Sequence, residues 1–149
     1  MEINKSLLDN LLEQAAASPR LRMNYDLRTS PEDSSQRMLN ALLPGTVLPI
    51  HRHTKTTEVL VVLRGKMEEI YYEVADEAVL DGDSHCVDVC RRRVARETER
   101  ILLEAGGPVQ GLSIPVGQWH GINVLEPTVI LECKDGAYEP IGEEDMIKN

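Results

Sequence analysis

The chain has 149 residues, of which 42% are hydrophobic and 3% aromatic, with no Phe. That length is typical of one domain with its own core, which excludes a wholly disordered chain and requires a core built mainly from aliphatic side chains. A formal net charge of -9 and a pI near 4.9 repel nucleic acid and anionic membranes and attract cations, so we expect neither as a partner.

The first predicted element is an amphipathic helix over residues 6–17. Its apolar stripe consists of Leu7, Leu8, Leu11, Leu12 and Ala15. Ser6, followed by Asp9 three residues later, resembles a capping box at the start of this helix. Pro19 ends the helix, and the alternation of apolar and polar residues over 21–27 then predicts a half-buried strand.

After a loop at residues 31–35, the pattern becomes typical of β structure. The predicted strands cover 36–43, 58–63, 67–74, 111–114, 121–125 and 128–133. Gly and Pro separate them and no long helical pattern intervenes, which favours a sandwich or barrel over βαβ units. We therefore predict an all-β single domain, in which a helix and leading strand (1–30) pack on a barrel (31–149).

The segment 75–104 is ambiguous. Its second half fits a helix by composition or a strand over 98–103, and its arginines, closely followed by glutamates, indicate a solvated segment.

The sequence also predicts a cytoplasmic protein. Residues 1–6 lack the features of a secretory signal, and no window approaches a membrane span. The odd number of cysteines fits a reducing compartment. His85, Cys86 and Cys90 match no standard zinc spacing, so we interpret them as ordinary side chains.

The segment 45–58 carries the first group of candidate metal ligands. His51 and His53 are two positions apart, and residues i and i+2 of an extended chain face the same side. Glu58 begins the next predicted strand, and if it points inward, Leu60 and Val62 point inward too. A carboxylate among apolar neighbours is costly without charge compensation, which a metal ion supplies.

The second group is a single residue some 60 positions later. His120 begins a strand after a turn, and if it points inward, Ile122 and Val124 do so as well. Three imidazoles and one carboxylate suit Fe(II), Mn(II), Ni(II), Zn(II) or Cu(II), and four ligands leave a position open for water or substrate. We therefore predict a divalent transition-metal site formed by His51, His53, Glu58 and His120.

These residues resemble the two motifs of the cupin family. The first motif is matched at every spacing by Gly45, His51, His53, Glu58 and Gly65, and the second by Pro115, Gly117 and His120. The second motif departs from the pattern, because its leading glycine is displaced to Gly111 and Asn123 comes one residue early. The resemblance implies the double-stranded β-helix, or jelly-roll barrel, of the cupins.

Within the cupins, the chain resembles the WbuC family of cupin-fold metalloproteins over nearly its whole length. The matching segments are 20–24, 36–45 and 132–140, and residues 78–96 look like an insertion relative to that family. The family is often encoded among genes for surface-polysaccharide synthesis. The resemblance therefore implies a role in polysaccharide biosynthesis, acting on a sugar-derived small molecule.

Several polar residues are candidates for binding such a ligand. They are Arg22, Asn24, Gln36, Asn40 and Tyr138. Alternation leaves two orientations open: facing inward they would line a pocket for a hydroxylated ligand, and facing outward they would be solvated or at an interface. The resemblance favours the inward orientation for Arg22, Asn24 and Asn40. Lys134 has the same ambiguity, whereas Trp119 and Cys133 are interpreted as packing residues.

The leading functional hypothesis is a metal-dependent isomerase or epimerase acting on a small sugar-derived metabolite. One alternative is an Fe(II) dioxygenase, because three histidines and a glutamate also serve oxygen chemistry. Another is a non-catalytic domain that binds or senses a small ligand. A homodimer is also expected, because exposed strands in a small open barrel favour pairing.

Overall fold

A computed structural model describes the backbone of residues 1–79 and 90–147. In chain order, its elements are α1 (Lys5–Ala17), β1 (Arg22–Asp26), β2 (Ser35–Leu42), β3 (Ile50–His51), β4 (Glu58–Arg64), β5 (Lys66–Val79), β6 (Cys90–Glu104), β7 (Gly111–Ile114), β8 (Trp119–Val124), β9 (Thr128–Asp135), the 3-10 helix η1 (Glu143–Asp145) and β10 (Met146–Ile147). The prediction of an all-β fold with a short N-terminal helix is confirmed.

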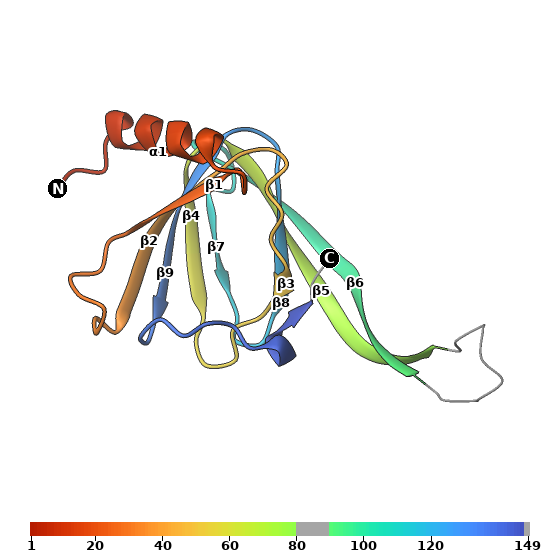
Figure 1. Cartoon of the computed structure of the whole chain (residues 1–149). Helices are drawn as coiled ribbons and strands as arrows, with labels where there is room; N and C mark the ends of the chain where they lie inside the picture. The colour runs from red at the N-terminus through yellow and green to blue at the C-terminus, as the bar shows by residue number, and fades with distance from the viewer. Residues whose placement is uncertain (80–89, 148–149) are drawn as a thin grey trace.

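The described strands form two antiparallel sheets that face each other as a flattened barrel (Figure 1). The first sheet has the order β1-β2-β9-β4-β7, and the second has the order β10-β3-β8-β5-β6. Apart from the consecutive pairs β1–β2 and β5–β6, neighbouring strands are distant in sequence, as β2 and β9 are, which is the connectivity of a jelly roll rather than of a simple meander. Because β1 is the edge strand of the first sheet, the leading strand is part of the barrel wall.

The interior of the barrel is filled by aliphatic side chains from both sheets. The buried cluster consists of Leu42, Leu60, Val62, Met67, Leu103, Ile114, Val124 and Ile130. Along β4 the buried residues alternate with Val59 and Val61, which are 42% and 36% exposed. Glu58 therefore points inward together with Leu60 and Val62, as predicted.

Helix α1 covers the outer surface of the first sheet. Leu11 and Ala15 are buried against Leu39, Ala41 and Val129, so alternate residues of β2 pack under the helix while their neighbours face the barrel interior. The predicted capping box at Ser6 is wrong. The helix begins one residue earlier than expected, and the side chain of Asn4 accepts the hydrogen bond of the Leu7 N–H at 3.1 Å.

The ambiguous segment 75–104 contains strand rather than helix wherever it is described. Strands β5 and β6 pair from Lys66 and Glu104 to Val79 and Cys90, and this hairpin extends well beyond the barrel (Figure 1). Ion pairs cross it between Arg100 and Glu68, Arg96 and Glu77, and Arg93 and Asp76. The alternation of arginines and acidic residues thus reflects cross-strand pairing, which overrides the helical composition.

The C-terminal segment after β9 runs along one end of the barrel and returns to the second sheet (Figure 1). Strand β10 pairs with β3, which places Met146 beside His51. The Arg52 side chain donates to Asp145 at 2.7 Å, and its backbone N–H donates to the Asp145 carbonyl at 3.1 Å. At the other end of the segment, the Gln36 amide donates to the carbonyls of residues 136 and 137.

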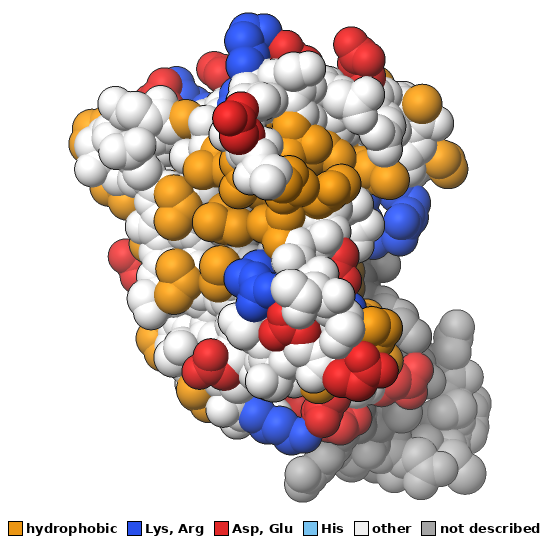
Figure 2. All heavy atoms as spheres, turned by 90° about the vertical axis from the view of Figure 1, so that its left-hand side faces the viewer, with side chains coloured by type: hydrophobic (Ala, Val, Ile, Leu, Met, Phe, Trp, Pro, Cys, Tyr) orange, Lys and Arg blue, Asp and Glu red, His pale blue; other side chains and the backbone are white. Residues whose placement is uncertain are grey.

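One face of the molecule carries a group of apolar side chains (Figure 2). Hydrophobic side chains gather in the upper half of the face shown in Figure 2, while acidic and basic side chains lie around and below them. Within the described part of the chain, no helix has the length and apolar character needed to cross a membrane.

Candidate metal centre

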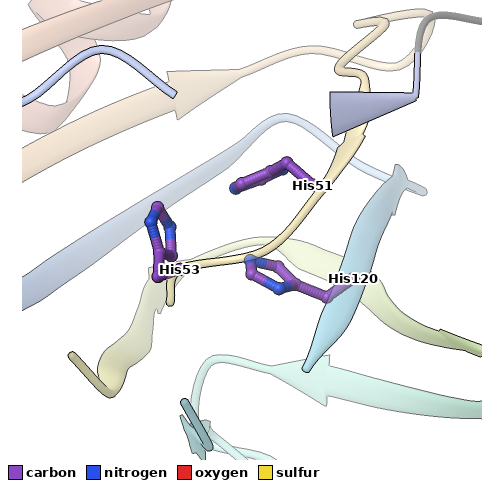
Figure 3. Close-up of side chains that lie close together, drawn as sticks. All are labelled: His51, His53 and His120. Carbon is purple, nitrogen blue, oxygen red and sulfur yellow. The ribbon is translucent and has the colours of Figure 1, made fainter. Parts of the chain in front are cut away.

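Three histidines converge where the motifs predicted a metal site. His51 lies on β3, His53 follows that strand, and His120 lies on β8 directly opposite His51 in the antiparallel register. Their potential ligand nitrogens all lie within 4.8 Å of one another. The ring of His51 is 5.1 Å from that of His53 and 4.3 Å from that of His120, and Figure 3 shows the three rings facing a common point.

Local backbone contacts position these three residues and favour one tautomer for His51 and His120. The Gly117 N–H donates to the His53 carbonyl at 2.8 Å, which ties the turn before β8 to the loop after β3. The Nδ1 atom of His51 lies 3.1 Å from the Pro49 carbonyl, and that of His120 lies 2.9 Å from the Gln118 carbonyl. A proton on each Nδ1 satisfies these carbonyls and leaves Nε2 as the free donor for a metal ion.

The protonation states of these imidazoles favour metal binding. Burial lowers the pKa of His51 to about 4, with a further contribution from the nearby His120. Burial also lowers the pKa of His120. Both rings are therefore neutral near pH 7, and a neutral imidazole is the form that binds a metal ion.

Glu58 lies beside the histidines and is only 5% exposed. Its Oε2 atom is 2.8 Å from His53 Nε2 and 3.5 Å from Lys134 Nζ. Burial by itself raises the pKa of Glu58, but the hydrogen bond with His53 and the charge of Lys134 hold it low, at about 2. The donor set of three imidazoles with an adjacent ionised carboxylate fits a divalent transition metal, provided that Glu58 releases His53.

Lys134 is the cation at the centre of this site. It lies opposite Glu58 in the register of β4 and β9, and its Nζ atom is 3.4 Å from His53 Nε2 and 3.5 Å from Glu132 Oε1. Glu132 in turn accepts a hydrogen bond of 2.9 Å from Asn40. From the sequence, the orientation of Lys134 was ambiguous and Glu132 was not predicted as a site residue. Their spacing of two on one strand nevertheless places both on the same face.

Glu69 is a second residue of this region that was not predicted from the sequence. It lies on β5, it is completely buried, and both of its carboxyl oxygens lack a hydrogen-bond partner among the described residues. Burial raises its pKa well above the usual range, and the charges of Glu58 and Glu132 add to this effect. The alternation of Met67, Glu69 and Tyr71 was the available signal, but two adjacent glutamates in a charged segment concealed which one points inward.

A cavity of about 360 Å³ borders the histidines. All five predicted ligand-binding residues line it, namely Arg22, Asn24, Gln36, Asn40 and Tyr138. Gln36 is occupied in holding the C-terminal segment, and Tyr138 is 57% exposed. Burial lowers the pKa of the Arg22 guanidinium, and Arg20 contributes to the same shift.

The remaining candidates lie away from the centre or outside the described residues. Trp119 is 8% exposed and lies under the Arg52 guanidinium, 4.7 Å from its ring centroid. Burial raises the pKa of the half-buried Cys133 thiol, which disfavours a reactive thiolate. His85, Cys86 and the side chain of Cys90 are outside the described part of the structure.

Comparison with known proteins supports the fold. The model of a family described as "Domain of unknown function (DUF6016)" matches residues 3–81, and no curated protein matches the sequence. Among solved structures, L-ribose isomerase of Cellulomonas parahominis superimposes with a TM-score of 0.55 at 17% identity, over 93% of this chain and 86% of that one. The capsular polysaccharide assembling protein CapF of Staphylococcus aureus gives a TM-score of 0.53 at 17% identity, over 87% and 32% of the two chains.

An oxalate oxidase in complex with the substrate analogue glycolate is a third similar structure, with a TM-score of 0.54 at 16% identity. The match covers 85% of this chain and 56% of the oxidase, so the chain spans about half the length of that protein. These structures have the cupin fold, and the jelly-roll barrel predicted from the two motifs is therefore confirmed.

Proposed function

The chain belongs to the family described as Domain of unknown function (DUF6016), and we propose that it is a cupin metalloprotein whose ligands are His51, His53, Glu58 and His120. The observation that carries this proposal is the convergence of three imidazole nitrogens within 4.8 Å of one another beside a buried carboxylate. Such a donor set accepts Zn, Fe, Mn or Ni, and geometry and supply determine which ion is bound.

Lys134 has a defined part in this proposal. It compensates the charge of Glu58 through a contact of 3.5 Å. A bound divalent ion attracts the Glu58 carboxylate and repels the ammonium group, so we expect Lys134 to remain with Glu132, which it also contacts. Glu58 is then free to leave His53 for the metal.

We further propose that the protein acts on a small sugar-derived metabolite by isomerisation or epimerisation. The cavity beside the histidines has polar groups suited to hydroxyls, and the similar L-ribose isomerase acts on a sugar. The resemblance to the WbuC family and the similarity to a capsular polysaccharide assembling protein favour surface-polysaccharide metabolism. A divalent ion bound at the histidines would polarise a carbonyl or hydroxyl oxygen, while Asn24, Asn40 and Arg22 would orient the ligand.

The metal site is tested by elemental analysis of purified protein. We expect about one transition-metal ion per chain in the wild type, and a metal affinity at least ~10–100-fold lower in His120→Ala. Asn123→Ala is the matched control, because Asn123 lies on the same strand but its side chain bonds to Glu68 on the outer face. A wild type without stoichiometric metal, or a His120→Ala protein with full metal content, contradicts the proposal.

The reaction type is tested in D₂O with the metal-loaded protein. Sugar phosphates, nucleotide sugars and sugar acids would be examined by NMR for conversion and for deuterium incorporation at carbon, because isomerisation by proton transfer exchanges a C–H proton with solvent. If no member of these classes is converted, the isomerase or epimerase proposal fails, although the metal site can still stand.

An oxygen-using enzyme is the second candidate, favoured by the three clustered histidines with Glu58 beside His53 and by the fold shared with an oxalate oxidase. It requires oxygen consumption by the Fe(II) protein and none by the Zn(II) protein. A non-catalytic ligand-binding or sensor domain would instead gain thermal stability from a ligand without forming a product. Testing the same sugar phosphates, nucleotide sugars and sugar acids for conversion, oxygen consumption and thermal stabilisation therefore distinguishes the three functions.

Self-association and cytoplasmic location remain predictions. Tyr25, Val59 and Val61 are exposed on strands of the first sheet, and their apolar surface supports a homodimer. Sedimentation velocity over a range of protein concentrations would detect it.

A further inference from the structure

Glu69 occupies an unusual place in the second sheet. It lies opposite Ile122 in the register of β5 and β8, between the pairs Tyr71 with His120 and Met67 with Val124. Its partner Ile122 is two residues after His120 on β8, so Glu69 lies next to the level of His120, on the side of the aliphatic core. It borders the same cavity of about 360 Å³ as the three histidines.

The surroundings of Glu69 do not compensate its polarity. Both carboxyl oxygens are buried and without a hydrogen-bond partner among the described residues. The charges that act on it are those of Glu58 and Glu132, both of the same sign as its own, and Lys134 already contacts those two residues. A buried, unpartnered carboxyl group destabilises a fold, and an apolar side chain of similar shape would pack there without that cost.

We propose that Glu69 contacts the ligand, and that its two carboxyl oxygens hydrogen-bond hydroxyl groups on the uncharged part of a polyol or sugar that enters the inner end of the cavity. This inference deepens the proposed function, because it depends on a ligand entering the cavity beside the histidines. The ligand class follows from charge. Glu58 and Glu132 repel a carboxylate or phosphate at this end, whereas a hydroxyl can donate to a carboxylate or accept from a carboxylic acid.

Glu69 borders the cavity, but its side chain has no exposed surface, so the carboxyl group is not open to the cavity in this conformation. A rotation about its side-chain bonds turns the carboxyl group toward a ligand that fills the cavity. Asn40 and Glu132, which are hydrogen-bonded to each other, line the same space and offer further polar contacts to a polyhydroxylated molecule.

The experiment measures the shift in unfolding temperature caused by L-ribose, xylitol and glycerol as neutral probes, with wild type, Glu69→Gln and Glu69→Met. We expect at least one probe to stabilise the wild type, and its dissociation constant to rise about tenfold or more in Glu69→Met, with a smaller rise in Glu69→Gln. Glu68→Gln is the matched control, because Glu68 is adjacent in sequence but bonds Arg100 and Asn123 on the other face, and it should retain the wild-type response.

Three results would each overturn the assignment. The first is that none of the three probes stabilises the wild type, and the second is that the Glu69 variants bind them as the wild type does. The third is a large fall in the probe-free unfolding temperature of both Glu69 variants, which identifies a structural role. We expect Glu69→Met instead to be at least as stable as the wild type, because it removes an unpartnered polar group. Metal content is measured in parallel, so a wild type that binds a probe through Glu69 but no metal refutes only the proposed function.

Discussion

At the scale of single residues, the candidate centre combines groups whose charges are controlled in different ways. His51 is kept neutral by burial, whereas Glu58 is kept ionised by His53 and Lys134 despite its burial. Glu132 has its pKa raised by burial and by the charge of Glu58, against the opposing effect of Lys134. The pH dependence of stability in the metal-free protein should therefore report on individual side chains.

The His51→Gln variant tests the histidine. The pKa of His51 is about 4 in the folded protein and about 6.5 when unperturbed, so the unfolded state binds more protons between these values. Stability from this group is fully present above pH 6.5 and is lost as the pH falls toward 4. We expect the free energy of unfolding of the metal-free wild type to decrease by up to ~1.4 kcal/mol per pH unit more steeply than that of His51→Gln over this window. Urea unfolding at a series of pH values measures this difference, and identical slopes would refute it.

At the scale of elements, tight turns place the site-bearing strands against each other. Gly65 joins β4 to β5 with φ of +84°, in the left-handed region that favours glycine. A Cβ atom there would overlap the Pro127 carbonyl oxygen and would lie 2.7 Å from Thr128 Oγ1. The Thr128 hydroxyl accepts from the Lys66 N–H at 3.0 Å, so the β4–β5 turn and the start of β9 are locked together.

We expect Gly65→Ala to destabilise the protein more than Gly106→Ala does. Gly106 also has positive φ, +73°, but a Cβ atom there would meet nothing within 4 Å. Its substitution should therefore cost only the conformational term of about 1–2 kcal/mol, while Gly65→Ala should cost a further ~1–3 kcal/mol from overpacking. Chemical denaturation of both variants measures the difference, and equal losses would mean that the close approach at Gly65 has no energetic weight.

At the scale of the whole molecule, the C-terminal segment completes the sheet that carries the histidines. Strand β10 pairs with β3, and the Arg52–Asp145 ion pair, with side chains 34% and 16% exposed, anchors the segment between His51 and His53. A second ion pair, Lys55–Glu139, is 74% and 66% exposed. Burial makes the first pair the stronger anchor, because solvent screens the second.

Hydrogen exchange tests this difference. Asp145→Ala should increase amide exchange in residues 141–147 and at His51, since their pairing depends on the anchored segment. Glu139→Ala should leave the exchange of the same amides close to that of the wild type. Mass spectrometry of peptic fragments provides the measurement, and the expectation fails if both variants exchange alike.

The fold class and the motifs that carry the candidate metal ligands could be predicted from the sequence alone. Alternation along Glu58, Leu60 and Val62 specified an inward carboxylate, and the spacing of His51, His53 and His120 specified their convergence, because both depend on local periodicity that strand geometry converts directly into position. The helix was also predictable, although its cap at Asn4 was not, since a one-residue shift in the start changes the capping side chain.

Other features depend on contacts between segments that are distant in sequence. The described residues of segment 75–104 form strands because cross-strand ion pairs and backbone pairing outweigh helical composition, and neither is visible in the sequence of one strand. The orientation of Asn40 depended on which face of β2 helix α1 covers. Likewise, Glu69, Glu132 and Lys134 came together from two sheets, and charges brought together by long-range pairing leave no pattern in the local sequence.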